Sequence, residues 1–246
     1  METGQPMSAA ILAGASISKQ FDGFAALTDV DLTVGKGERV GLIGPNGSGK
    51  STLVNCFAGI IAADSGSIVF DGADITAAPA WLRAKHGLAR TYQIPRPFHG
   101  MTVQENIQVP LRFAVGHRSA RVISVEAQAI LDQVGLADKA SRSPKVLTQV
   151  ELRKLELGRA LAARPKVLIA DEVMAGLSDS EVDEILALLT RLNAQGITIL
   201  LIEHIMRAVM MFSQRIVVIV AGRKIADGLP DDVMRQDDVE RAYLGE

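Results

Sequence analysis

The feature that most limits the fold of this chain is a glycine-rich segment at residues 44–52, with the sequence GPNGSGKST. The pattern of Gly, four residues, Gly, Lys and then Ser or Thr is typical of a phosphate-binding loop between a strand and a helix. Here an apolar run, Val40–Ile43, precedes the segment, and a helical pattern, Ser51–Ala58, overlaps its end. Because such a loop requires a strand that stops at the N-terminus of a helix, the segment predicts an α/β fold.

Each part of this loop suits the binding of a polyphosphate. Glycines let the backbone fold into a ring of N–H groups that an anion can approach closely, and the following helix directs its N-terminus at the same anion. Lys50 can reach the β- and γ-phosphates, and the Ser51 hydroxyl can bind Mg²⁺. We therefore predict a site for a nucleoside triphosphate. Its binding residues are Gly44, Pro45, Asn46, Gly47, Ser48, Gly49, Lys50, Ser51 and Thr52.

Short β-branched runs alternate with longer helical patterns along the rest of the chain. Several runs are apolar without alternation, as expected of strands that are covered on both faces. The first part of the chain is rich in predicted strands, and residues from about 103 to 163 are predicted to be helical. After them, strands and helices alternate strictly. This order predicts a parallel α/β core interrupted by a helical insertion. The predicted strands are Val40–Ile43, Ile68–Phe70, Val167–Ala170, Ile197–Ile202 and Ile216–Val220, and the predicted helices are Ser51–Ala58, Ser124–Val134, Glu151–Ala163, Ser180–Asn193 and His204–Phe212.

Two acids, Asp171 and Glu172, end the predicted strand Val167–Ala170. The carboxyl ends of such strands are where α/β proteins place their ligand chemistry. Asp171 can hold Mg²⁺ through a water molecule, and Glu172 can orient and polarise a water molecule for in-line attack on a phosphoryl group. Taken alone, the pair is equally consistent with capping of the next helix, but together with the phosphate-binding loop it favours catalysis.

Composition narrows the function further. The chain has 26 Lys and Arg against 28 Asp and Glu, a balance that argues against a nucleic-acid partner. Its single Cys, Cys56, cannot form an internal disulfide, which indicates a reducing compartment. No apolar run approaches the roughly 18 to 20 residues of a membrane-spanning helix. We expect a cytosolic protein or one that sits on a membrane without crossing it.

Lys50 and Asp171 lie 121 positions apart, too far for a compact GTPase core, and the guanine motif Asn-Lys-x-Asp is absent. The chain instead resembles the ATP-binding subunits of ABC transporters along nearly its whole length. In that resemblance, Phe21 matches the aromatic residue that stacks on adenine, Gln93 the glutamine that senses Mg²⁺ and the attacking water, and His204 the switch histidine at the γ-phosphate. The resemblance implies ATP and Mg²⁺ as ligands, Glu172, His204 and Gln93 as catalytic residues, and Ser51, Gln93 and Asp171 as the metal site.

Four further stretches resemble the importer branch for branched-chain (hydrophobic) amino acids. They are residues 101–106, 171–177, 203–210 and 241–246, with the sequences MTVQEN, DEVMAGL, EHIMRAVM and RAYLGE. Importers of urea and short-chain amides share many of these residues, so both classes of cargo stay open.

The resemblance also implies an architecture and partners. One ABC ATPase domain spans residues 1–246, with a nucleotide-binding core lobe at 10–93 and 164–246, an antiparallel β subdomain at its N-terminal side, and a helical signature subdomain at 94–163. Two such subunits, alike or different, are expected to pair head to tail around two Mg-ATP at the cytoplasmic face of the membrane. They would drive transmembrane permease subunits and act indirectly with a substrate-binding protein.

The signature, the segment that acts on the ATP of the partner subunit, departs from the family's Leu-Ser-Gly-Gly-Gln. The aligned residues are Leu147, Thr148, Gln149, Val150 and Glu151. Val150 places a β-branched side chain where backbone should approach phosphate, and such residues resist positive φ. Glu151 adds a carboxylate near a polyanion, which costs on the order of 4 kcal/mol at about 4 Å unless the side chain turns away. We predict slow hydrolysis at the site that this signature completes, and a weakly hydrolysing regulatory subunit is an alternative.

The stretch after Gln93 contains two prolines and the large apolar residues Phe98 and Met101. In the family, this region lines the groove that grips a cytoplasmic helix of the permease. The alternative is that both side chains belong to the core of the helical insertion. We expect Trp81 to pack under that insertion.

Overall fold

The computed structural model describes residues 10–114 and 119–244. The ends of the predicted 1–246 domain, residues 115–118 and the last two residues of the 241–246 stretch lie outside the described residues. The strands are β1 (Ala10–Phe21), β2 (Phe24–Gly35), β3 (Arg39–Ile43), β4 (Ser65–Phe70), β5 (Ala73–Asp74), β6 (Leu88–Arg90), β7 (Val167–Asp171), β8 (Thr198–Ile202), β9 (Arg215–Val220) and β10 (Arg223–Gly228). The helices are α1 (Lys50–Ala58), α2 (Ala80–His86), α3 (Val103–Ala114), α4 (Ala120–Val134), α5 (Gln149–Leu161), α6 (Asp179–Ala194), α7 (Met206–Phe212), α8 (Pro230–Met234) and α9 (Asp237–Leu244), with short 3₁₀ turns η1 (Ala137–Lys139) and η2 (Pro144–Val146).

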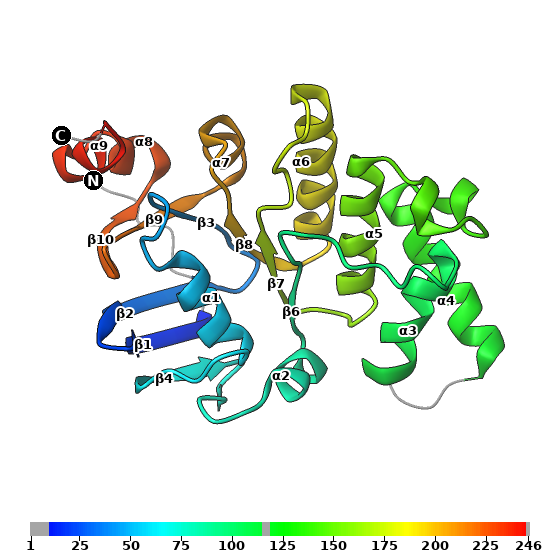
Figure 1. The fold of residues 1–246 in the computed structure, drawn as a ribbon, viewed down its shortest axis with the longest axis horizontal. Helices are drawn as coiled ribbons and strands as arrows, with labels where there is room; N and C mark the ends of the chain where they lie inside the picture. Colours follow the sequence, from blue (N-terminus) through cyan, green and yellow to red (C-terminus); the bar gives the residue numbers. More distant parts are fainter. Residues whose placement is uncertain (1–9, 115–118, 245–246) are drawn as a thin grey trace, which may run out of the picture.

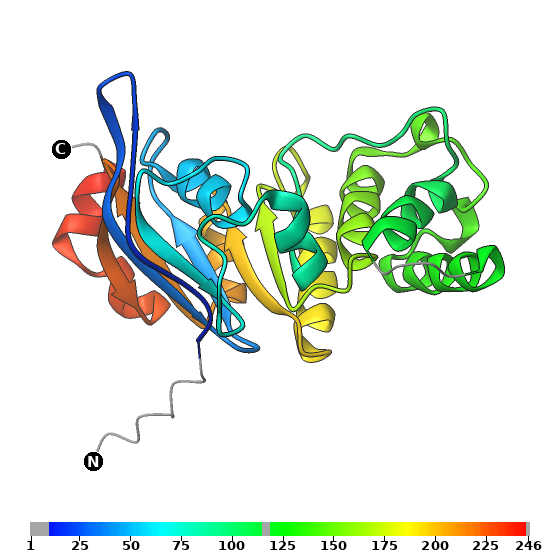
Figure 2. The same cartoon turned by 90° about the horizontal axis from the view of Figure 1, so that it is seen from below.

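These elements build two sheets (Figures 1 and 2). The larger sheet has the order β10-β9-β3-β8-β7-β6, and the smaller one has the order β2-β1-β4-β5. All neighbours in the larger sheet are parallel except β9 and β10, whereas the smaller sheet is antiparallel throughout. The predicted α/β fold with a parallel core and an antiparallel β subdomain is therefore confirmed.

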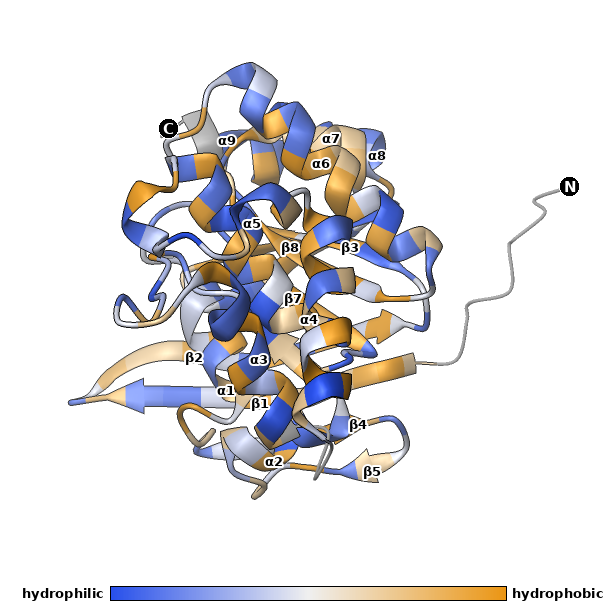
Figure 3. Cartoon of the chain, turned by 90° about the vertical axis from the view of Figure 1, so that its right-hand side faces the viewer, coloured by the Kyte–Doolittle hydropathy of each residue, from blue (hydrophilic) through white to orange (hydrophobic). Residues whose placement is uncertain are grey.

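The central strands are buried on both faces because successive side chains of a strand point to opposite sides. In β7, Val167 and Ile169 join the apolar cluster of α1 and the antiparallel sheet, whereas Leu168 and Ala170 join the cluster of α5 and α6. The hydropathy colouring of Figure 3 shows β7 and β8 as apolar strands inside the molecule. A continuous apolar run, without alternation, is what a doubly covered strand requires.

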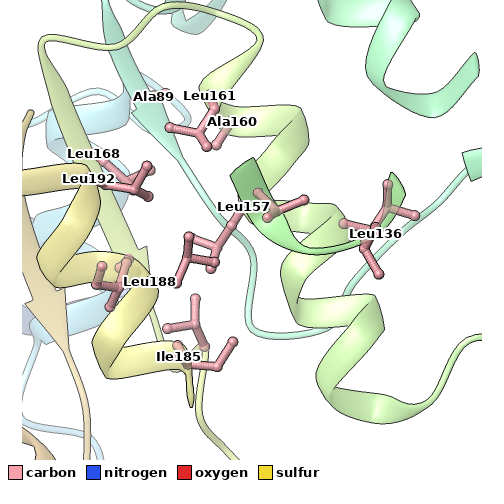
Figure 4. Packing of buried hydrophobic residues seen from close by; sticks show 14 of the residues in the cluster. Ala89, Leu136, Leu157, Ala160, Leu161, Leu168, Ile185, Leu188 and Leu192 are labelled. Carbon is pink, nitrogen blue, oxygen red and sulfur yellow. The ribbon is translucent and has the colours of Figure 1, made fainter. Parts of the chain in front are cut away.

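The helices α3, α4 and α5 lie beside the larger sheet, at the far end from the antiparallel sheet (Figure 1). Their core is continuous with that of the sheet, because Leu157 and Leu161 of α5 belong to the same buried cluster as Leu188 and Leu192 of α6. Figure 4 shows these leucines meeting between the two helices. The helical insertion is therefore packed onto the core through a shared apolar cluster.

All five predicted strands and all five predicted helices form, with shifted ends. Helix α4 begins four residues earlier than predicted, because Ser119 is its N-cap and accepts a hydrogen bond from the Val122 N–H at 3.4 Å. The expectation for Trp81 is wrong: it lies on α2 with 68% of its surface exposed. Within the described ranges, no helix combines the length and the apolar composition that crossing a bilayer demands.

Candidate nucleotide site

Most of the predicted site residues follow strands of the larger sheet, whose order is given above. The glycine-rich loop follows β3, Asp171 ends β7, and His204 follows β8, while the segment that carries Gln93 follows β6. These strands run parallel, so their carboxyl ends meet at the same edge. The topology thus brings together residues that are far apart in the chain.

The loop depends on glycine at its first position. Gly44 has φ 150, and a Cβ built there would lie 2.0 Å from the Ile219 carbonyl oxygen of the neighbouring strand β9. Gly49, the N-cap of α1, has φ 107, and a Cβ built there would lie 2.6 Å from the Ala26 carbonyl oxygen of β2. Side chains at these two positions would clash with the neighbouring strands, so packing explains why both residues are glycine.

The loop also fits a polyphosphate electrostatically. Lys50 is buried, and its Nζ donates to the carbonyl oxygens of Gly44 at 2.7 Å and Pro45 at 3.0 Å. Burial lowers the pKa of Lys50, and the nearby Glu172 and Asp171 oppose that effect. Helix α1 has no side-chain cap, and the buried Ser48 hydroxyl has no hydrogen-bond partner among the described residues. Unpaired donors at a helix N-terminus, next to a buried ammonium, suit an anion.

Glu172 is held between Gln93 and His204. The Gln93 Nε2 donates to Glu172 Oε2, and the His204 Nε2 lies 2.9 Å from Glu172 Oε1. Glu172 itself has φ 47, a left-handed backbone that is uncommon outside glycine and asparagine. The structure thus brings the three predicted catalytic residues into one hydrogen-bonded group, and both oxygens of the carboxylate are oriented.

Asp171 is anchored by two residues that the sequence analysis did not identify. Arg90 Nη2 donates to Asp171 Oδ2 at 2.7 Å, and the Asp171 N–H donates to the Thr91 hydroxyl at 3.1 Å. Both partners belong to or follow β6, whose three residues are too few for a recognisable strand pattern. The hydroxyl, amide and carboxylate oxygens of Ser51, Gln93 and Asp171 are the donor type that Mg²⁺ prefers.

Phe21 lies at the end of β1, paired across the hairpin with Phe24, and 43% of its surface is exposed. The Lys19 ammonium lies 5.5 Å from the centre of the Phe21 ring. Strand β2 of the same hairpin runs against the glycine-rich loop, through the contact between Ala26 and Gly49. The ring is thus exposed on the hairpin that borders the loop.

The signature residues form the start of α5, and the structure removes both reasons for predicting slow hydrolysis. Val150 has helical backbone and a side chain buried in the core of the helical insertion, so the argument from positive φ is wrong. Glu151 Oε2 accepts a hydrogen bond from the Thr148 N–H at 2.9 Å, and Oε1 pairs with Lys139. Although burial raises the pKa of Glu151, its bonds to Lys139 and Thr148 hold that pKa below the ordinary value. The Glu151 carboxylate is therefore engaged in the capping box of α5 and paired with a cation.

A cavity of about 280 Å³ separates α2 and β6 from α3 and α5. Its apolar lining includes Ile60, Tyr92, Phe98, Val109, Pro110 and Phe113. Phe98 and Met101 are 42% and 40% exposed, so the alternative that they belong to the core of the helical insertion is wrong. Phe98 lies over the Arg159 guanidinium, 4.9 Å from its ring centre, which fixes one wall of the cavity.

A phosphate-binding loop after β3 at the N-terminus of a helix, with an oriented carboxylate after β7 at the same edge of the sheet, is the arrangement of a phosphate-loop nucleoside triphosphatase. The family model described as "ABC transporter" matches residues 27–175, more than half of the 246 residues. The chain belongs to the ABC transporter family, and it is an ATP-binding, ATP-hydrolysing cassette of that family.

Several relatives match the chain along nearly its whole length. The high-affinity branched-chain amino acid transport ATP-binding protein BraF of Pseudomonas aeruginosa is 38% identical, with 98% of this chain and 100% of BraF covered. LivG of Escherichia coli, a protein of the same description, is 35% identical at the same coverage. The lipopolysaccharide export system ATP-binding protein LptB of Haemophilus influenzae is 33% identical, with 96% and 98% covered. Among solved structures, the ADP conformation of the cassette MJ1267 has a TM-score of 0.87 and 31% identity, over 97% of this chain and all of that chain.

Proposed function

We propose that this chain hydrolyses Mg-ATP at a head-to-tail dimer interface and so drives the uptake of branched-chain or related amino acids through partner permeases. The observation that carries the hydrolytic part is Glu172, held between Gln93 and His204 beside the glycine-rich loop. The similarity to BraF and LivG over 98% of this chain supports the cargo.

Each residue of the site has a distinct role in this proposal. The N–H groups of the loop and Lys50 bind the phosphates, and the exposed Phe21 ring stacks on adenine. Glu172 accepts the proton of the attacking water as a general base, while Gln93 and His204 keep its two oxygens aimed at that water. Ser51, Gln93 and Asp171 would hold Mg²⁺, which neutralises charge on the phosphates when bound.

The same proposal assigns partners to two surfaces. The exposed Thr148 and Gln149 at the start of α5 face the ATP of a second ATPase subunit. The Val150 side chain is buried, and the Glu151 carboxylate is paired with Lys139, so neither side chain is expected to contact that ATP. The apolar cavity beside Phe98 receives a cytoplasmic helix of the permease. Together these contacts keep the chain at the cytoplasmic face of the membrane, where it acts indirectly with a substrate-binding protein.

Lys50→Ala and Glu172→Gln test the site with different readouts. Lys50→Ala removes the buried ammonium, so we expect Mg-ATP affinity to fall at least tenfold in a fluorescent-nucleotide titration. Glu172→Gln removes the general base but keeps the loop, so affinity should persist while hydrolysis falls at least a hundredfold. Unchanged affinity in Lys50→Ala, or unchanged hydrolysis in Glu172→Gln, would refute the assignment.

The cargo is tested by uptake in cells that lack the gene. Complementation with the wild-type gene should restore uptake of labelled leucine, isoleucine or valine, and complementation with the Glu172→Gln gene should not. Restored uptake of urea or acetamide alone would move the assignment to the amide importers. Unchanged uptake of all of these compounds would refute the importer proposal.

A further inference from the structure

Arg153 joins two catalytic segments from within the helical insertion. It lies in the second turn of α5, and only 6% of its surface is exposed. Its Nη1 donates to the Gln93 carbonyl oxygen, and its Nη2 donates to the Ala175 carbonyl oxygen at 3.2 Å. Gln93 carries one contact to Glu172, and Ala175 lies three residues after Glu172. One guanidinium therefore ties both segments around Glu172 to the same helix.

Glu203 holds the same loop from the opposite side. It follows β8 directly, 2% of its surface is exposed, and its Oε1 accepts a hydrogen bond from the Met174 N–H at 2.8 Å. Its neighbour in the chain is His204, the other contact of Glu172. The loop from Glu172 to Ala175 thus has a buried carboxyl group at Met174 and a buried guanidinium at Ala175.

The left-handed backbone of Glu172 explains why such anchors are needed. A residue other than glycine in this region costs free energy and persists only when its surroundings force it. The Glu172 N–H extends the sheet by donating to the Ile202 carbonyl at 2.9 Å, which holds the strand side of the turn. Arg153 and Glu203 are the buried charged groups that hold the other side.

We propose that Arg153 and Glu203 are positioning residues for ATP hydrolysis, which clamp the loop after Glu172 so that its carboxylate stays between Gln93 and His204. This inference rests on the proposed roles of Gln93, Glu172 and His204. Neither residue needs to touch ATP. Their effect is on the fraction of molecules in which Glu172 is aimed correctly, and so on kcat rather than on nucleotide affinity.

The burial of these two charges favours a catalytic purpose over simple core packing. Burial is the main cause that raises the pKa of Glu203 to about 7, with the nearby Glu172 adding to it and the Met174 N–H and Arg153 opposing it. Burial also lowers the pKa of Arg153, and its Nε has no partner among the described residues. A protein with buried charged groups is often less stable than a variant with apolar residues in their place. Ionisable groups with strongly shifted pKa values also tend to occur at functional sites.

The test compares Arg153→Met, Arg153→Lys, Glu203→Met and Glu203→Gln in the full-length chain. We expect the two Met variants to lower kcat for ATP hydrolysis at least tenfold, with KM for ATP within twofold of the wild type. Glu203→Gln keeps an acceptor for the Met174 N–H and should recover kcat to within threefold. Arg153→Lys keeps the charge but cannot reach both carbonyls, so it should be intermediate.

Arg83→Lys is the matched control, because Arg83 is equally buried and also donates to main-chain carbonyls, those of Cys56, Phe57, Thr76 and Ala78. It should lower the melting temperature without changing kcat. Hydrogen–deuterium exchange should speed up in residues 172–178 of the Met variants and stay unchanged in β3 and α1. Unchanged kcat in the Met variants, a rise in KM with kcat unchanged, or faster exchange throughout the chain would overturn the proposal.

Glu172→Gln, measured alongside, separates this inference from the function on which it rests. If Glu172→Gln abolishes hydrolysis while the Arg153 and Glu203 variants keep it, only the clamp is refuted. If Glu172→Gln keeps hydrolysis, the assignment of the site itself fails, and the clamp fails with it.

Discussion

At the scale of single residues, Glu172 shows how backbone and side chain act together. Its positive φ turns the chain sharply at the end of β7, and the same turn presents its carboxylate to residues that follow β6 and β8. A glycine at this position would relieve the backbone but supply no carboxylate. The strained backbone thus occurs at the residue that supplies the carboxylate, and buried neighbours such as Glu203 hold this backbone conformation.

Glu203 makes the stability of the protein depend on pH. Its pKa is raised from 4.5 to about 7, so the folded state binds the proton more tightly than the unfolded chain does. Stability is therefore lost as pH rises through this window, by about 3 kcal/mol, since each pH unit contributes about 1.4 kcal/mol. We predict that Glu203→Gln gains stability over the wild type between about pH 4.5 and 7. Urea unfolding at several pH values measures the difference, with the exposed Glu240→Gln as control, and a gap that does not change with pH would contradict this prediction.

At the scale of elements, helix α5 serves several surfaces at once. Its first turn carries the signature, Arg153 reaches the catalytic loops, and Arg159 supports Phe98 in the wall of the apolar cavity. One helix thus contacts both the segments around Glu172 and the apolar cavity. The two unusual residues of the signature have structural roles in this helix. The Val150 side chain packs in the apolar cluster, and Glu151 forms the capping box.

We therefore predict that restoring the family's residues in the double variant Val150→Gly, Glu151→Gln changes ATP turnover by less than twofold. It should lower the free energy of unfolding by about 1–3 kcal/mol, because a buried valine is lost and glycine disfavours a helix. Turnover and urea unfolding of the same preparation measure both effects. Val125→Gly, at an exposed position of α4, isolates the cost of glycine in a helix. A several-fold rise in turnover would show that the altered signature does slow hydrolysis.

At the scale of the whole molecule, the segment from Gln93 to Phe98 connects the candidate nucleotide site with the apolar cavity. Gln93 contacts Glu172 at one end, and Phe98 lines the cavity at the other. The Arg96 carbonyl between them accepts a hydrogen bond from Arg159 at 2.8 Å, which ties the segment to α5. A molecule bound in the cavity would thus contact the same segment that reaches Glu172.

Phe98→Glu should uncouple transport from hydrolysis. The new carboxylate would lie near Arg159 and keep the local structure, but a charge in the cavity opposes binding of an apolar helix. We predict that Mg-ATP affinity stays within twofold, whereas cargo uptake falls at least tenfold. Uptake in complemented cells and nucleotide titration measure the two effects, and Leu229→Glu, exposed and remote from the cavity, is the control. Weakened ATP binding in Phe98→Glu would point instead to a role in folding.

Local patterns in the sequence determined the phosphate-binding loop, the doubly covered strands and the order of the helices. Each of these features depends on residues that are close together in the chain. The resemblance to a family supplied Gln93 and His204, and the sheet then explained why they meet Glu172. Only the tertiary structure identified Arg90, Arg153, Glu203 and Lys139, and only it showed that the Glu151 carboxylate caps α5 and pairs with Lys139. Each of these depends on partners that the chain brings close by folding, and no local pattern records which distant residue will stand opposite.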